Sequence, residues 1–292
     1  NWILRKMHVQ AKWRLFPTGP EMIKAFTRGE LDIGYIGLPP AMIGISRGLS
    51  LRCVAGGHME GTVFTAGKDF KTFQELGSVK KTLTQFKGRT VGTPTKGSIH
   101  DVIIRNLLEK SHLQSDVTVR NFSWADEILE AMEDGEVDGG VGTPPLAILA
   151  QRLMDTRLIL PPRLMWPHNP SYGIVTTVDA IHGLPALVEG FLALHEEACN
   201  LIRTSPKKAA EVTAKTLGVV DKDFILEVYA VSPKYCASLS KEYVNSALSF
   251  VPFLKKMGYI SSPIKAKSVF HTDFIEKIHP ERPHYEDAGA LA

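Results

Sequence analysis

The chain repeats one stretch, Phe16-Pro-Thr-Gly-Pro-Glu-Met-Ile-Lys-Ala-Phe-Thr-Arg-Gly-Glu-Leu-Asp-Ile-Gly34, which returns as Phe122-Ser-Trp-Ala-Asp-Glu-Ile-Leu-Glu-Ala-Met-Glu-Asp-Gly-Glu-Val-Asp-Gly-Gly140. The second copy lies 106 positions after the first, counted from 16 to 122. Each copy continues to a Pro-Pro pair, at 39–40 and 144–145. Solenoid repeats have units of only about 20–50 residues. The repeat therefore predicts two similar lobes, with a ligand cleft between them.

Length and composition agree with two globular lobes. A chain of 292 residues exceeds what one hydrophobic core normally supports. With 44% hydrophobic and 22% charged residues, it resembles neither disordered nor collagen-like sequences. A net charge of +3 is too small to indicate a nucleic-acid partner, and no apolar run approaches the roughly 18 residues of a membrane span.

The three cysteines, Cys53, Cys199 and Cys236, stand apart without a CxxC pair. Their spacing fits neither a zinc site nor a disulfide framework. We expect partly buried free thiols. The sequence also lacks GxGxxG, GxxxxGK[ST], HExxH and GxSxG, so we predict no catalytic residue, no metal and no cofactor.

Short apolar runs alternate with helical patterns, which predicts a mainly parallel α/β architecture. The first predicted strand covers 9–16. We place lobe 1 at residues 1–87, lobe 2 at 88–178, and a helical return to lobe 1 at 179–292. A strand at 173–177 is expected to pass back to lobe 1.

Open α/β sheets bind ligands in the loops after their strands, where helix N-termini present unpaired N–H groups. The duplicated layout brings five such loops together. They supply the candidate ligand contacts Thr18, Gly19, Gly37, Leu38, Pro39, Gly57, His58, Lys96, Gly97, Ser98, Ile99, His100, Thr143 and Pro144. The aromatic candidates are Trp124, Trp166 and Tyr172.

Two interpretations stay open for these residues. The turn from Lys96 to His100 either holds an anionic or polar ligand atom, with charge from Lys96 and His100, or contains only a capping box of Ser98 and Asp101. The aromatic side chains either stack on the ligand or pack between lobes. The acids of the repeated Gly-Glu-x-Asp turns are expected to be structural.

Several motifs, in this order, resemble the nitrate/sulfonate/taurine (NMT1-like) group of periplasmic solute-binding proteins of ABC importers. They are Thr18 to Glu21, Gly29 to Gly34 with the following Pro-Pro pair, Gly88 to Pro94 leading to Gly97-Ser98, Gly135 to Asp138, and Ser205 to Ala210. The resemblance covers about residues 9 to 260.

This resemblance implies a type II periplasmic-binding-protein fold without enzymatic activity. A small anionic or heteroaromatic ligand, such as a sulfonate, carboxylate or pyrimidine, would be trapped by hinge closure and the closed form recognised by a membrane permease. A periplasmic or membrane-anchored monomer is expected. Residues 1–7 resemble the end of the family's first helix, so we expect a preceding strand–helix unit in the natural protein.

Two other classes use the same fold. One comprises biosynthetic enzymes of the menaquinone and thiamine pathways, and the other the ligand-sensing domains of LysR-type regulators. An adjacent histidine pair and a cysteine-rich motif, typical of the thiamine enzymes, are absent. A menaquinone-type lyase remains the alternative function.

Overall fold

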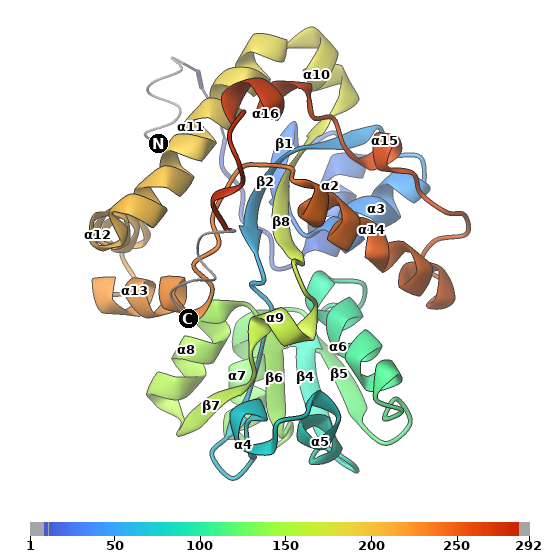
Figure 1. Ribbon diagram of the computed structural model, residues 1–292, viewed down its shortest axis with the longest axis vertical. Helices are drawn as coiled ribbons and strands as arrows, with labels where there is room; N and C mark the ends of the chain where they lie inside the picture. Colours follow the sequence, from blue (N-terminus) through green and yellow to red (C-terminus); the bar gives the residue numbers. More distant parts are fainter. Residues whose placement is uncertain (1–8, 11, 286–292) are drawn as a thin grey trace. The chain divides into compact units, whose positions relative to one another are not determined.

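The chain passes between two structural units twice, at Met59/Glu60 and at Asn169/Pro170 (Figure 1). The computed structural model describes residues 9–10 and 12–285. Unit 1 contains the chain up to Met59 and from Pro170 onward, and unit 2 contains Glu60–Asn169. These crossing points come earlier than the expected boundaries at 87/88 and 178/179. The segment after Glu60 lies in unit 2 because its strand pairs only there.

Unit 1 has a three-stranded sheet in the order β1 (Ile33–Ile36), β8 (Pro170–Thr177), β2 (Leu51–Met59). The central strand β8 is antiparallel to both neighbours, so β1 and β2 run in the same direction. As predicted, the strand at 173–177 belongs to the first lobe. The register of β2 against β8 shifts three times, which bends β2 along its length.

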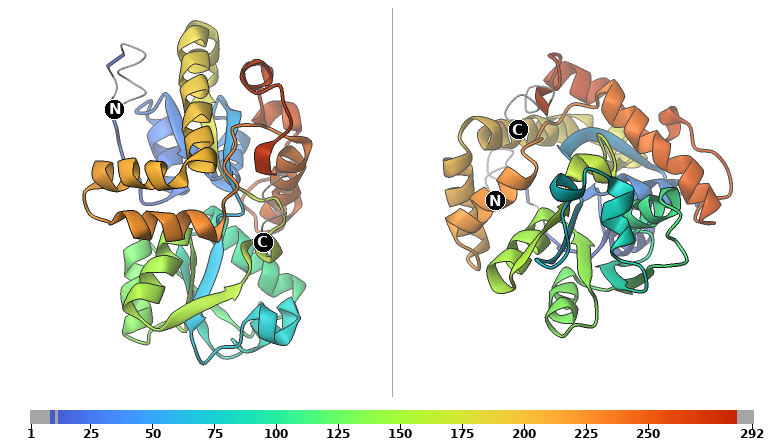
Figure 2. Two further views of the ribbon diagram at one scale, coloured as in Figure 1. Left: turned by 60° about the vertical axis from the view of Figure 1, so that its left-hand side comes forward. Right: turned by 60° about the horizontal axis from the view of Figure 1, so that its bottom comes forward.

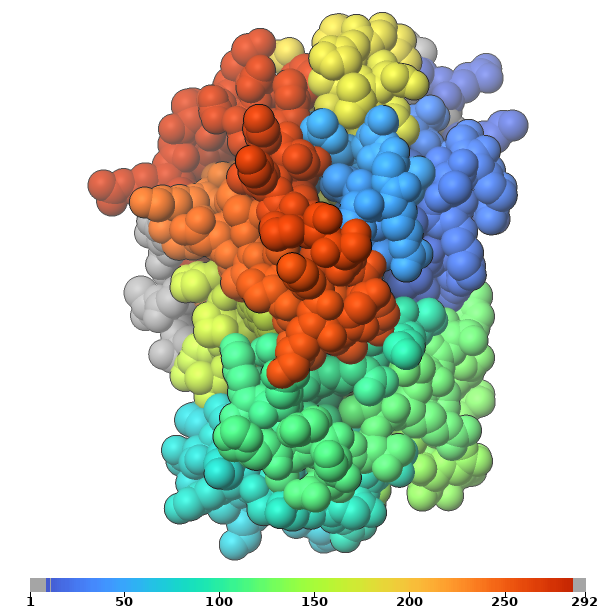
Figure 3. All heavy atoms as spheres, turned by 90° about the vertical axis from the view of Figure 1, so that its right-hand side faces the viewer, coloured from blue at the N-terminus to red at the C-terminus, as the bar shows by residue number. Residues whose placement is uncertain are grey.

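The helices of unit 1 come from both parts of the chain that form this unit. They are α2 (Gly19–Thr27), α3 (Leu38–Ser46), α10 (Val178–Gly183), α11 (Pro185–Thr204), α12 (Pro206–Leu217), α13 (Lys222–Val231), α14 (Lys241–Lys256), α15 (Ala266–Val269) and α16 (Asp273–Ile278). Val54, Ile174, Leu192 and Phe274 form part of one buried cluster. Helices α12 and α13 pack side by side (Figure 2). The segment from α14 to residue 285 is orange to red in Figure 3.

Unit 2 has a five-stranded sheet in the order β5 (Thr118–Phe122), β4 (Thr90–Pro94), β6 (Gly139–Gly142), β3 (Val63–Gly67), β7 (Thr156–Leu160). Strand β4 is parallel to β5 and β6, whereas β3 is antiparallel to β6 and β7. Its helices are α4 (Phe73–Leu76), α5 (Val79–Thr84), α6 (Ile99–Lys110), α7 (Ala125–Glu133), α8 (Pro144–Leu153) and α9 (Pro162–Met165).

The sequence repeat is also a structural repeat. Its first copy forms α2, β1 and α3 of unit 1, and its second forms α7, β6 and α8 of unit 2. Gly29 and Gly135 end the first helix of each copy with φ of 67° and 71°, a conformation that favours glycine. The residue after each glycine donates its N–H to a helix carbonyl, Ala25 O in one copy and Ala131 O in the other.

The two acids of the second copy make contacts within the protein, as expected for a structural role. Asp138 accepts a hydrogen bond from the Thr90 N–H at 2.9 Å, and Glu136 pairs with exposed Arg120. The strand predicted at 9–16 is absent from the described residues 9–10 and 12–16. The side chains from Lys12 to Leu15 are exposed, so no buried face holds them in a sheet. Within the described residues, no helix is both long and apolar enough to cross a membrane.

Candidate functional site

Three helices of unit 2 begin at the same edge of its sheet. Strands β5, β4 and β6 are adjacent and parallel, so their carboxyl ends lie together. Helices α7, α6 and α8 follow these strands, with Trp124, Ser98 and Thr143 as their N-cap residues. The first N–H groups of an α-helix have no partner within the helix, and its N-terminus favours anions. This edge therefore presents three groups of N–H donors.

The turn before α6 is built around Ser98 and Asp101. The Ser98 Oγ accepts a hydrogen bond from the Asp101 N–H at 3.2 Å, and the Asp101 carboxylate accepts one from the Gly97 N–H at 2.9 Å. Gly97 has φ of 81°, which suits glycine. Asp101 is fully buried and is also paired with Arg105 at 2.7 Å. The Ser98 side chain thus caps α6, as predicted, and the N–H groups of Ile99 and His100 lie in the first turn.

His100 does not supply the positive charge expected from the sequence. Its side chain is buried, and burial lowers its pKa to about 4. The ring is neutral at pH 7 because removal from water disfavours the imidazolium. Its Nδ1 lies 3.1 Å from the hydroxyl oxygen of buried Thr62. His100 can therefore act as a hydrogen-bonding group, while the positive charge at this turn belongs to exposed Lys96.

The other N-caps of this edge leave their side chains available. Neither Trp124 nor Thr143 caps its helix with its side chain, and both are exposed. Pro144 begins α8 and is buried. The Glu127 carboxylate accepts hydrogen bonds from the backbone N–H groups of Ser123 at 2.8 Å and Trp124 at 3.3 Å.

Trp166 lies in a different setting from Trp124. Its side chain is buried, and the Lys110 ammonium lies 5.3 Å from the ring centroid. A cation in this position is attracted by the electron-rich ring face. Stacking of Trp166 on a ligand would require the ring to be uncovered.

Unit 1 has a comparable edge at the carboxyl ends of β1 and β2. Gly37 is the N-cap of α3, which begins with buried Leu38 and Pro39. A Cβ on Gly19 would lie 2.6 Å from the Cγ of Pro40, so the start of α2 touches that of α3. Thr18 is the N-cap of α2, yet its buried hydroxyl has no hydrogen-bond partner among the described residues.

Gly57, His58 and Tyr172 pack together at this edge of unit 1. A Cβ on Gly57 would lie 2.0 Å from the Tyr172 ring. The His58 ring stacks on Tyr235 with centroids 4.3 Å apart, and its Nε2 lies 2.8 Å from the Ser232 carbonyl oxygen. His58 is thus held by the protein itself.

Three residues near these edges, Tyr35, His195 and Thr62, were missed in the sequence. The Tyr35 ring lies edge-on to Tyr172, with centroids 5.6 Å apart, and its hydroxyl lies 3.4 Å from His195 Nδ1. Thr62 reaches the unit 2 edge because β3 is antiparallel, which places the start of β3 beside the end of β6. The alternation of side chains between the two faces of β1 could have identified Tyr35 as a candidate. No local sequence pattern identifies Thr62 or His195.

Residues 5–218 match the NMT1-like family. The chain belongs to the NMT1-like family. The resemblance inferred from the repeated motifs is therefore confirmed.

This NMT1-like protein is similar to proteins named for binding. It is 24% identical over 92% of its length to a binding protein of Brucella abortus (strain 2308), 83% of which is covered. It is 25% identical over 74% of its length to an Escherichia coli (strain K12) protein named for binding aliphatic sulfonates, 66% of which is covered.

Its fold is that of the alkanesulfonate-binding protein SsuA from Xanthomonas axonopodis pv. citri, solved with MOPS bound. The TM-score is 0.75 at 17% identity, with 92% of this chain and 90% of that chain covered. The predicted type II periplasmic-binding-protein fold is confirmed.

Proposed function

We propose that this NMT1-like protein is the solute-binding receptor of an ABC importer, and that its solute is a small organic anion of the sulfonate or carboxylate type. The observation that carries the proposal is the meeting of three helix N-termini at one edge of the unit 2 sheet. Such N-termini bind sulfate-like and carboxylate groups through N–H donors and the helix dipole.

The chemistry of the side chains supports an anion held by neutral donors. Ser98 and Thr143 offer hydroxyl groups, and neutral His100 offers an imidazole. Exposed Lys96 adds a positive charge in solvent. Trp124, 49% exposed at the start of α7, offers an apolar surface for the organic part of the solute.

Unit 1 supports the proposal through Thr18. A buried hydroxyl without a partner is unfavourable, by about 1–3 kcal/mol, unless something satisfies it. A solute oxygen at the start of α2 would do so. We propose Thr18 as the solute contact that unit 1 contributes.

The comparisons favour a receptor over the alternative lyase. Two of the similar proteins are named for binding sulfonates, and these names concern binding rather than catalysis. The partner proposed here is the permease of the same importer, and the proposed location is the periplasm or the outer face of the membrane.

A thermal-shift screen tests the solute class. The panel is alkanesulfonates, nitrate, aromatic carboxylates and pyrimidines. A solute at 100 times its Kd stabilises the folded protein by about 2.7 kcal/mol. We expect a sulfonate or carboxylate to raise the Tm of the protein. NMR of the compound after incubation with the protein should show that it is chemically unchanged. Chemical conversion of the bound compound would support the lyase instead.

The variant Thr18→Val tests the site with a matched control. Valine keeps the shape of threonine and puts a methyl group in place of a hydroxyl that has no hydrogen-bond partner among the described residues. The free energy of unfolding should stay the same or increase. The solute affinity should fall about tenfold or more, as for a lost hydrogen bond to an anion. The control is Thr156→Val, another unpartnered buried hydroxyl, at the opposite edge of the unit 2 sheet. Equal affinities in both variants would contradict a role for Thr18.

A further inference from the structure

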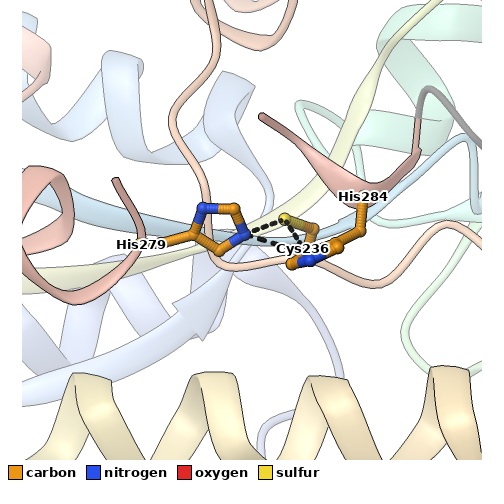
Figure 4. Close-up of side chains that lie close together, drawn as sticks. All are labelled: Cys236, His279 and His284. Carbon is orange, nitrogen blue, oxygen red and sulfur yellow. Dashed lines mark hydrogen bonds between the residues drawn. The ribbon is translucent and has the colours of Figure 1, made fainter. Parts of the chain in front are cut away.

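Three side chains of unit 1 direct potential metal ligands toward one point (Figure 4). The Sγ of Cys236 lies 3.2 Å from Nε2 of His279 and 3.7 Å from Nδ1 of His284, and these two nitrogens are 2.9 Å apart. Among the described residues, this is a group whose ligand atoms all lie within 4.8 Å of one another. None of the three belongs to the proposed solute site.

We propose that Cys236, His279 and His284 form a binding site for a zinc-class divalent cation. Around tetrahedral zinc, Zn–S and Zn–N distances of about 2.3 and 2.0–2.1 Å place S and N about 3.6 Å apart, and two N atoms about 3.4 Å apart. The observed separations of 3.2, 3.7 and 2.9 Å lie close to these edges. Small side-chain rotations would complete the geometry.

The donor set and its spacing suit this class of cation. Thiolate and imidazole are the preferred ligands of zinc and chemically similar metals, rather than of calcium or magnesium. Four residues separate His279 from His284, which falls within the three to five that commonly separate zinc-binding histidines. The spacing of the cysteines predicted no zinc site, because that argument considers only sites built from cysteine pairs. The site proposed here combines one cysteine with two histidines.

The surroundings hold the three ligands in place. Cys236 and His279 are buried, and His284 is partly exposed, which leaves a route for the cation. The Cys236 N–H donates to the Gly57 carbonyl at 2.9 Å, which ties this ligand to β2. His279 directly follows α16, and the Tyr285 hydroxyl beside His284 hydrogen-bonds Ser240 Oγ at 2.5 Å. Three chain segments therefore converge on the site.

Glu196 lies next to the site but is already engaged. Its Oε1 is 3.9 Å from His284 Nδ1 and 2.6 Å from Arg203 Nη2, while its Oε2 accepts from the Ala237 N–H at 2.8 Å. The described protein thus supplies three ligands, and water or a small anion completes the fourth position. Binding releases the thiol proton and any proton on the two coordinating nitrogens, so affinity falls in acid.

Cobalt(II) is the probe, because it reports thiolate coordination through a charge-transfer absorption band. The full chain, reduced and stripped of metal, is titrated with Co²⁺ in the absence of solute. We expect the band to appear with one equivalent of Co²⁺ and to vanish when Zn²⁺ is added. Zn²⁺ should also raise the Tm. No band in the folded protein would overturn the proposal.

Matched variants identify the ligands. Cys236→Ser should abolish the band, and His284→Ala should weaken cobalt affinity at least tenfold. The controls are Cys53→Ser, a buried thiol that donates to the Ala55 carbonyl, and His182→Ala, an exposed histidine. Both should keep wild-type affinity. Because His284 is partly exposed, its variant should remain folded, as circular dichroism can verify. A band that persists in Cys236→Ser, or equal losses in the controls, would place the metal elsewhere.

Discussion

The carboxylate of Glu60 accepts a hydrogen bond from the backbone N–H of His168 at 2.9 Å, joining the two segments by which the chain enters and leaves unit 2. The Glu60 N–H in turn donates to the Asn169 carbonyl at 2.8 Å. Glu60 and His168 have φ of 57° and 55°, which few non-glycine residues adopt. Side-chain and backbone contacts thus hold both segments in uncommon conformations.

We expect Glu60→Ala to lower the free energy of unfolding by about 2 kcal/mol, as for a lost hydrogen bond to a charged group. Glu60→Gln should lose less, because its amide oxygen can still accept from His168. Urea unfolding of both variants checks this order. Equal losses would show that the carboxylate oxygen is not the stabilising contact.

Gly57→Ala should destabilise unit 1. The added methyl would lie 2.0 Å from the Tyr172 ring, which is fixed between Tyr35 and His58. Overpacking of this kind lowers stability by about 1–3 kcal/mol. Gly67→Ala is the control, since a methyl there meets nothing within 4 Å and φ is not positive. Thermal unfolding should separate the two, and an unchanged Tm for Gly57→Ala would contradict the close packing.

Ser98→Ala should weaken both the fold and solute binding. Loss of the N-cap lowers stability by about 1 kcal/mol. The hydroxyl accepts from Asp101 but retains its hydrogen for a solute oxygen, so affinity should fall about tenfold. Ser78→Ala removes an equivalent cap at the start of α5. The Ser78→Ala variant should lose as much stability as Ser98→Ala and should bind the solute with unchanged affinity. If Ser98→Ala also binds normally, the turn is only structural.

His100 should make the protein less stable in acid. Its folded-state pKa is about 4, below the ordinary value of 6.5, so the unfolded chain binds a proton that the folded protein excludes. Stability is unaffected above pH 6.5 and declines as pH falls from 6.5 to 4, by about 2–3 kcal/mol at pH 4.5. The variant His100→Asn should remove this part of the pH dependence. Urea unfolding at pH 7 and pH 4.5 measures it, and an identical pH dependence in both proteins would contradict the buried neutral ring.

Much of the fold could be predicted because it depends on local backbone chemistry. Glycines at 29 and 135 end helices in both copies of the repeat, and the prolines at 39 and 144 lie in the first turns of α3 and α8. The loop residues at Thr18, Ser98 and Thr143 were found for the same reason, since a helix start has a recognisable composition. These local features predict the helices of both copies of the repeat and the loops of the candidate solute site, but not where the chain crosses between the units.

The sequence by itself determined the repeat, the family resemblance, and the helix starts that are proposed to bind a solute. Only the tertiary structure decided that β3 pairs with β6 and β7, that His100 is neutral, that Lys110 covers Trp166, and that Cys236 meets two histidines more than 40 residues away. The physical reason is the distance along the chain between the groups that interact. Helix caps and turns are satisfied by neighbours along the chain, whereas strand pairing, desolvation and ligand convergence depend on groups that only the folded chain brings together.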